Sequence, residues 1–454
     1  MRCRGFGMTP NVFRVNCTTG AAHRPSTQRA KLRRTNLVKL TLICCIFLMM
    51  ATLYARAAGD SIEKLADDPA CVRALAWIDK NSAWVTDQQI HLTEIPAPEF
   101  KEGVRAEFLK KIFEAAGLNV QIDKTGNVIA ERPGTDANSI ILLAAHLDTV
   151  FPAGTDVRVK RHGNRLTAPG IADNGAGLAA LTGLARALSE SRIQTAKTIV
   201  LAGDVGEEGE GNLRGIRALV ESYGPRLAAV IAVDGASTEH ITTQAIASHR
   251  FEIAITGPGG HSWSDFGAPN PITALSRGIV KFSAIPVPDD PRSSYNFGMI
   301  EGGTSVNSIP ARAAVKVDVR SEDEVEVNKM ERALRDAMQS GAREEMSTAH
   351  DENETLRVIV RSLGSRPAGK LPDNAALLET LRNVDRFLGN RSRLERSSTD
   401  ANIPLSLNIP AVSLGGGGKG GGSHTTAEWY DASARELGLK RLFLATIALA
   451  GVQP

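Results

Sequence analysis

The sequence predicts an α/β fold with a smaller domain inserted into it. Three apolar runs have the length and composition of buried strands: 140–146, Thr198–Ala202 and Leu227–Val233. Further along the chain the pattern changes to strand, helix, strand, strand, helix, strand, the order of a ferredoxin-like unit. We therefore divide the chain into a leader, a first part of the main domain, the inserted domain and a second part of the main domain: 1–57, 58–249, 250–364 and 365–454.

The other elements of the main domain follow from apolar spacing and from Gly and Pro boundaries. Glu102 to Ala116 has helical spacing, and Gly117 ends it. Thr155 to Ala168 alternates like a hairpin, and a loop of small residues opens a helix near Ala176. After the inserted domain the pattern predicts two helices and one buried strand: 374–387, 434–450 and 411–414. Residues 415–422 contain seven glycines, which we interpret as a mobile loop near a site because a strand precedes them and a His follows.

The first 57 residues have the features of a secretory signal peptide. They carry ten Lys and Arg and no Asp or Glu. A basic segment (31–39) precedes an apolar run (Leu40–Tyr54), and Ala55-Arg56-Ala57 offers a small-x-small cleavage site. We expect an exported protein, periplasmic or secreted, with no stable membrane insertion after cleavage. An uncleaved anchor is the alternative, but the run is short for a spanning helix, which needs about 20 apolar residues.

Charge and cysteine content narrow the classes of function. Beyond the leader the chain holds 43 Lys and Arg against 50 Asp and Glu, a net charge of −7, so nothing favours binding to nucleic acid. Cys71 is the single cysteine after residue 57. The mature chain therefore has no intramolecular disulfide and no thiolate metal site.

Seven chemically active side chains follow predicted strands or open a helix. They are His146, Asp148, Asp173, Glu207, Glu208, Asp234 and His424. Two imidazoles with several carboxylates suit one or two hydrolytic metal ions, zinc first and manganese or cobalt next. Two metals about 4 Å apart need a bridging carboxylate, terminal ligands, a carboxylate base and a carboxylate that orients a His. Each residue has an ordinary alternative, such as a helix N-cap for Asp173, but the full set favours a metal-dependent hydrolase.

On these residues the chain resembles the aminoacylase/glutamate-carboxypeptidase family of co-catalytic zinc peptidases, peptidase family M20. That family includes the tripeptide aminopeptidases and the acetylornithine and succinyl-diaminopimelate deacylases. The matching motifs, in family order, are His146-Leu-Asp-Thr-Val, Gly170-Ile-Ala-Asp173-Asn-Gly, Gly206-Glu-Glu-Gly, Val233-Asp-Gly, Gly257-Pro-Gly-Gly-His261, Asn307-Ser-Ile-Pro and His424-Thr-Thr-Ala-Glu. The resemblance runs from about Asp87 to the C-terminus. It implies a three-layer zinc-exopeptidase-like catalytic domain with an inserted ferredoxin-like lid.

The resemblance also implies two divalent metal ions and assigns their ligands. His146 and Asp234 would bind one metal. Glu208 and His424 would bind the other, and Asp173 would bridge the two. Zn²⁺ is the first expectation, with Mn²⁺ or Co²⁺ as alternatives.

Two further carboxylates receive catalytic roles from the same resemblance. Asp148 would hold the ring of His146. Glu207 would be the general base, which takes a proton from the attacking water and returns it to the leaving amine.

Three residues of the inserted domain match family positions that contact substrate. His261 would cross a dimer interface to steady the oxyanion in the partner's site, which implies a homodimer. Asn307 and Arg320 would hold a substrate carboxylate, a task that suits a planar guanidinium. The alternatives are that His261 only caps a Gly-rich turn and that Arg320 pairs with Asp318 or Glu322.

The sequence thus favours an exported metal-dependent exopeptidase or amide hydrolase acting on small peptides or N-acyl amino acids. Export disfavours the biosynthetic deacylases, whose substrates are cytoplasmic. A small-molecule N-deacylase remains one alternative. Another is a catalytically inactive periplasmic peptide-binding protein on the same fold, and the presence of Glu207 speaks against it.

Overall fold

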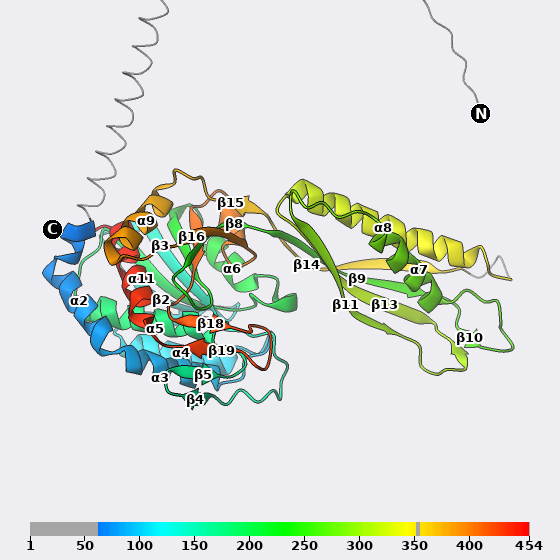
Figure 1. Ribbon diagram of the computed structural model, residues 1–454, viewed down its shortest axis with the longest axis horizontal. Coiled ribbons are helices and arrows are strands. Elements are labelled where there is room, and N and C mark those ends of the chain that lie inside the picture. The colour runs from blue at the N-terminus through cyan, green and yellow to red at the C-terminus, as the bar shows by residue number, and fades with distance from the viewer. Residues whose placement is uncertain (1–61, 351–354, 454) are drawn as a thin grey trace, which may run out of the picture. The chain divides into compact units, whose positions relative to one another are not determined.

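A nine-stranded mixed sheet organises the main domain in the computed structural model, which describes residues 62–350 and 355–453 (Figure 1). In spatial order its strands are β1 (Asn119–Ile122), β2 (Val128–Arg132), β6 (Lys197–Asp204), β3 (Asp136–His146), β7 (Leu227–Val233), β17 (Ala411–Leu414), β8 (His240–Ala245) and β15 (Gly369–Lys370), with β16 (Arg393–Ser397) also paired to β8. The central strands β6, β3, β7 and β17 are parallel. This mixed sheet confirms the predicted α/β class.

The connections between the central strands place helices on both faces of the sheet. β3 leads through α5 (Gly175–Ser191) to β6, and β6 leads through α6 (Arg214–Tyr223) to β7, on the other side of β3. Because such crossovers are right-handed, α5 and α6 lie on opposite faces of the sheet. The chain therefore reverses its direction across the sheet at β3, and α/β sheets bind ligands beyond the carboxyl ends of the strands at such a point.

The remaining helices of the main domain pack around this sheet. They are α2 (Pro69–Lys80), α3 (Ser82–Thr93), α4 (Gly103–Ala115), α9 (Ala376–Leu388), α10 (Asn402–Ser406) and α11 (Arg435–Ala450). Residues 140–145 of β3 are all buried, as the apolar run predicts. On β6, a Cβ atom at Gly203 would come within 2.3 Å of the Leu109 side chain, so glycine lets α4 pack closely against the sheet.

The inserted domain has a four-stranded antiparallel sheet and two helices. Its strands lie in the order β11 (Ser293–Gly302), β13 (Arg312–Ser321), β9 (Ala247–Thr256) and β14 (Arg357–Arg366). Helices α7 (Pro271–Ser283) and α8 (Glu324–Met346) pack on the face that buries Phe251, Ile253 and Ile255. The alternate positions of β9, among them Arg250 and Glu252, face the other way. Strand β10 (Gly260–His261) follows the end of β9 and pairs antiparallel with β12 (Ser308–Ile309), which comes after β11 in the chain.

A second small sheet holds the glycine run in place. It contains β18 (Lys419–Gly421), β19 (Trp429–Asp431), β5 (Arg165–Thr167) and β4 (Lys160–His162). The Tyr430 hydroxyl donates to the Gly417 carbonyl at 3.0 Å. A Cβ atom at Gly418 would come within 2.3 Å of that hydroxyl, so glycine permits this close approach. The run that was expected to be a mobile loop is therefore held by backbone pairing of β18 with β19 and by the Tyr430 hydroxyl.

The predicted leader, residues 1–57, lies outside the described residues. None of the helices that the structure describes is both long and apolar enough to cross a membrane.

Candidate metal centre

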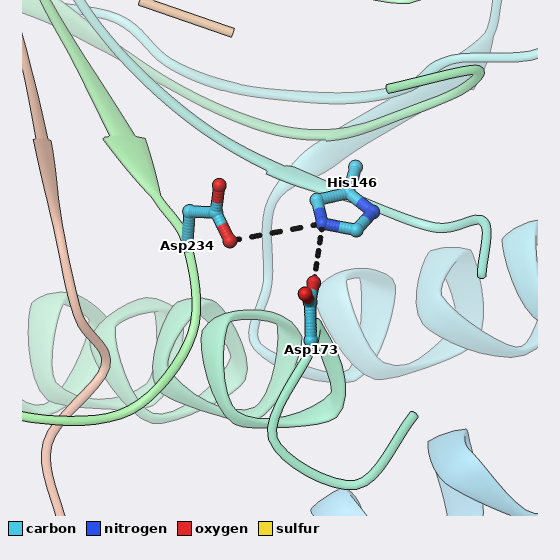
Figure 2. Close-up of side chains that lie close together, drawn as sticks. All are labelled: His146, Asp173 and Asp234. Atoms are coloured by element: carbon cyan, nitrogen blue, oxygen red, sulfur yellow. Dashed lines mark hydrogen bonds and ion pairs between the residues drawn. The ribbon is translucent and has the colours of Figure 1, made fainter. Parts of the chain in front are cut away.

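The first group of predicted ligands meets at the carboxyl ends of β3 and β7 (Figure 2). His146 is the last residue of β3, Asp234 follows β7, and Asp173 lies in the loop before α5. The Nε2 atom of His146 lies 3.1 Å from Oδ1 of Asp173 and 3.8 Å from Oδ1 of Asp234. The three residues offer one ligand atom each within 4.8 Å of one another, close enough to bind a single ion.

A second group forms around the other oxygen of the same aspartate. His424 Nε2 lies 3.2 Å from Oδ2 of Asp173 and 3.0 Å from Oε1 of Glu208. These three residues also offer ligand atoms within 4.8 Å of one another. Asp173 therefore belongs to both groups and presents one carboxylate oxygen to each, which is the geometry of a bridging ligand.

The electrostatics of the two groups favour cations. Burial opposes the charged form of His146, but the surrounding carboxylates outweigh it and raise the pKa of His146 well above its usual value. Hydrogen bonds to Asp173 and Glu208 raise the pKa of His424 to about 10. Carboxylates that stabilise positive charge at these imidazoles also stabilise bound cations, so the donor set of two imidazoles and three carboxylates fits two divalent ions.

Asp148 connects the first group to the loop that carries the candidate base. Its carboxylate oxygens accept hydrogen bonds from the backbone N–H groups of Glu207 at 3.0 Å and Glu208 at 2.8 Å. The Nδ1 atom of His146 is nearer to the Asp148 backbone oxygen, at 3.1 Å, than to its carboxylate, at 3.7 Å. The residue thus contacts the ring as expected, mainly through its main chain, and its side chain orients the 207–208 loop.

Glu207 is buried beside the ligands and paired with an arginine, Arg366, that is not among the predicted site residues. Arg366 Nη1 lies 2.7 Å from Oε1 of Glu207, and Nη2 also donates to the Glu207 carbonyl. The two side chains are 5% and 6% exposed. Burial raises the pKa of Glu207 to about 8, and the charge of Arg366 opposes this rise. The only sequence signal for Arg366 was its place before Pro367, at the boundary between the inserted and main domains.

Two more buried carboxylates lie behind the site. Asp204 ends β6, Asp400 precedes α10, and each is at most 2% exposed. Both oxygens of Asp204 and Oδ1 of Asp400 have no hydrogen-bond partner among the described residues. Burial raises the pKa of Asp204 to about 7, and burial together with Asp204 raises the pKa of Asp400 well above its usual value. Neither residue is among the predicted site residues, although Asp204 lies two positions after the predicted strand Thr198–Ala202.

The three predicted substrate-contacting residues lie at opposite ends of the inserted domain. At one end of the sheet, Ser248 of β9 pairs in register with Arg320 of β13 on one side and with Arg366 of β14 on the other. Arg320 Nε donates to Asp318 at 2.6 Å, the ion pair considered as the alternative. His261 and Asn307 are exposed at the other end, where the Ser262 N–H donates to the Asn307 carbonyl at 3.0 Å. Among the described contacts, no hydrogen bond or ion pair joins His261 to the metal ligands.

Comparison with known proteins now identifies the family. The profile of peptidase family M20/M25/M40 matches residues 142–447, which include all seven groups of the site. The chain belongs to this family. The resemblance seen in the sequence is thereby confirmed, and so is the predicted enzyme class, a hydrolase. Enzymes of the M20 family use divalent metal ions, typically zinc, in agreement with the two ligand groups.

Several relatives support the same assignment. A Mycobacterium tuberculosis protein assigned the name succinyl-diaminopimelate desuccinylase DapE is 26% identical over 72% of this chain and 88% of its own length. The structure of aminopeptidase PepT from Bacillus cereus has a TM-score of 0.64 at 22% identity and covers 82% of this chain and 99% of its own. A tripeptidase from Staphylococcus aureus has a TM-score of 0.66 at 20% identity, with coverage of 82% and 99%. At such identities the two structures show that this M20 family member shares their fold.

Proposed function

We propose that this protein is an exported exopeptidase or amide hydrolase that uses two divalent metal ions, most readily Zn²⁺, to cleave small peptides or N-acyl amino acids. The observation that carries the proposal is the placement of Asp173. One of its oxygens faces His146 and the other faces His424, so a single carboxylate serves two ligand groups.

The catalytic step follows from the groups around Glu207. Two bound cations would polarise the scissile carbonyl and lower the pKa of the attacking water. Glu207, adjacent to the ligand Glu208, would accept the proton of that water and return it to the leaving amine. Arg366 favours the ionised form of Glu207, and Asp148 fixes the loop that carries it.

The relatives support a small substrate with an amide bond. They bear the names of a desuccinylase, an aminopeptidase and a tripeptidase, which all act on such compounds. We place the substrate carboxylate near Arg320, because this residue lies in the same register row as Arg366, which contacts the base. His261 and Asn307 would act on the site of a second subunit, since their end of the inserted domain is remote from the metal ligands of their own chain.

The test is hydrolysis of dipeptides, tripeptides and N-acyl amino acids by the leaderless chain loaded with Zn²⁺, Mn²⁺ or Co²⁺. We expect cleavage that a chelator abolishes. Glu207→Ala should lower kcat by roughly 10²- to 10⁴-fold, the usual contribution of a general base, while two metal ions still bind. Glu210→Ala is the control, because Glu210 lies on the same loop, pairs with Lys316 and belongs to neither ligand group. Two bound ions without cleavage of any substrate would favour the peptide-binding alternative.

Export and assembly are tested separately. Cleavage near Ala57 should appear as a new N-terminus when the full chain is produced in a bacterium with a periplasm. Sedimentation of the leaderless chain should show a dimer. A leader that remains attached would support an anchor, and a monomer at micromolar concentration would contradict the role given to His261.

A further inference from the structure

Glu428 is a fully buried carboxylate that the proposed reaction does not use. It is 0% exposed. Its Oε2 atom accepts the N–H of Gly170 at 2.8 Å, and its Oε1 atom accepts those of Ala172 at 2.8 Å and Asp173 at 2.7 Å. None of the ion pairs in the described part of the chain involves Glu428. Three backbone donors therefore stabilise its charge, in an arrangement like the nests that bind anions.

These three donors belong to the loop that presents the bridging ligand. The N–H of Asp173 itself is one of them, so the position of the Glu428 carboxylate sets the position of the Asp173 main chain. The main chain of Glu428 holds the same region, because its carbonyl accepts the N–H of Ala168 at 3.2 Å. Side chain and main chain together fix residues 168–173.

Glu428 is also tied closely to the other loop of the second ligand group. It lies four residues after His424. Between them the Thr425 N–H donates to the Gly422 carbonyl, and the Glu428 N–H donates to the Thr425 carbonyl, each at 3.1 Å. The segment 422–428 therefore contains two consecutive hydrogen-bonded turns. His424 lies in the first turn, and Glu428 is the last residue of the second. The His424 backbone is in the left-handed region, with φ 64°, so its orientation depends on these turns.

We propose that Glu428 is a positioning residue that holds the Asp173 and His424 loops together and so sets the affinity of the metal site formed by Asp173, Glu208 and His424. The inference rests on the proposed two-metal function. The other site depends less on Glu428, because two of its ligands, His146 and Asp234, are placed by strands β3 and β7 of the central sheet.

Glutamine at position 428 removes this clamp with almost no change in size. Its amide nitrogen is a donor, and it would face an N–H group where a carboxylate oxygen now accepts. At least one of the three hydrogen bonds is lost, because the glutamine NH₂ group then faces a buried backbone N–H group and neither can accept. Residues that orient metal ligands typically change metal affinity by roughly 10- to 100-fold when they are replaced.

The experiment is a titration of the metal-free leaderless chain with Zn²⁺ against a competing chelator. We expect two ions per wild-type chain. In Glu428→Gln the first ion should bind within about threefold of wild type and the second roughly 10- to 100-fold more weakly, the range for residues behind metal ligands. Added Zn²⁺ should restore kcat in this variant without a change in KM, a rescue that a general loss of folding would not show.

Two further variants make the result decisive. Glu94→Gln is the control. The Glu94 carboxylate also accepts a backbone N–H, that of Val159 at 2.9 Å, but it belongs to neither ligand group, so both metal affinities should stay unchanged. Glu428→Asp keeps the charge and shortens the reach, and we expect an intermediate loss at the second site; it decides the question if the glutamine variant does not fold. Equal weakening of both ions, or an unchanged second ion, would overturn the positioning role alone. A wild-type chain that binds no metal would overturn the proposed function and this inference together.

Discussion

Arg366 links the inserted domain to the candidate base, and its replacement by methionine isolates that contact. The guanidinium donates to the Glu207 carboxylate at 2.7 Å, and both side chains are nearly fully buried. Burial already raises the pKa of Glu207, and the charge of Arg366 limits this rise. Arg366→Met should therefore raise the pKa of Glu207 further and leave less of the ionised base at neutral pH.

The size of the effect follows from the type of bond. A hydrogen bond to a charged group contributes about 1.5–3 kcal/mol, and about 1.4 kcal/mol corresponds to a tenfold change in rate, so kcat/KM should fall roughly 10- to 150-fold. The same energy corresponds to a shift of roughly one to two units in the pKa of Glu207. The acid limb of the kcat/KM profile should therefore move to higher pH, because the base must lose its proton before it can act. Arg366→Lys should fall between wild type and Arg366→Met, since an ammonium can make one of the two contacts.

The assay is kcat/KM from pH 5 to 9 on the metal-loaded enzyme, with the number of bound ions measured for each variant. Arg361→Met is the matched control. Arg361 lies on the same strand, is exposed and pairs with Glu252 at 3.0 Å. The reasoning is refuted if Arg366→Met keeps kcat/KM within threefold of wild type with an unmoved acid limb, or if Arg361→Met shows an equal loss.

Three further predictions address the ligands, the buried carboxylates and the inserted domain. Asp173→Asn should weaken both metal ions, each roughly 10-fold or more, because one side chain serves both groups, and equilibrium dialysis that still finds two tight ions would contradict the bridging geometry. The pKa of Asp204 is raised to about 7 in the metal-free folded chain, whereas an Asp in the unfolded chain loses its proton above about pH 4. Wild type should therefore lose stability as the pH rises from about 4 to about 7. Asp204→Asn removes that loss, and its melting temperature should fall less than that of wild type between pH 5 and pH 8 in the presence of a chelator. His261→Ala and Glu207→Ala should each be inactive alone, but an equal mixture after subunit exchange should regain about a quarter of wild-type activity if His261 acts across a twofold dimer, and no recovery would show that it does not.

The central strands could be predicted because each carries its own signal. The runs that form β3, β6 and β7 are continuous and apolar, and they form strands buried on both faces. β8 and β16 gave no such signal. Both are short and rich in polar residues. They form because β16 pairs with β8 and β8 also pairs with β17 and β15, all of them far from β8 in the sequence. A single segment of sequence contains no information about such partners.

The ligands could be predicted for a related reason, since most of them end a strand or open a helix. The position of each such residue at the edge of the sheet therefore follows from the predicted strand or helix alone, without knowledge of its contacts. Arg366, Asp204 and Asp400 act through burial behind the site, and burial depends on how the inserted domain and α10 pack against the loop of Glu207. An arginine before a proline looks in the sequence like a surface residue, and the strand-end place of Asp204 does not reveal that its carboxylate is buried without a hydrogen-bond partner among the described residues. Glu428 lay inside a recognised motif, but its partners are backbone N–H groups about 255 residues earlier, which no side-chain pattern reveals.

The dimensions of the inserted domain link its two ends to different active sites. β9 has ten residues, and at about 3.3 Å per residue it spans roughly 30 Å. Near its start, Ser248 pairs in register with Arg320 and with Arg366, which contacts the base, and its last residue leads to His261. The rigid sheet therefore keeps His261 far from the metal ligands of its own chain. In the proposed dimer, one inserted domain would supply the arginine that holds Glu207 in its own subunit and the imidazole that completes the partner's site. A displacement of this domain would then change both sites at once, and the mixture of His261→Ala and Glu207→Ala chains tests the half of this arrangement that crosses between the subunits.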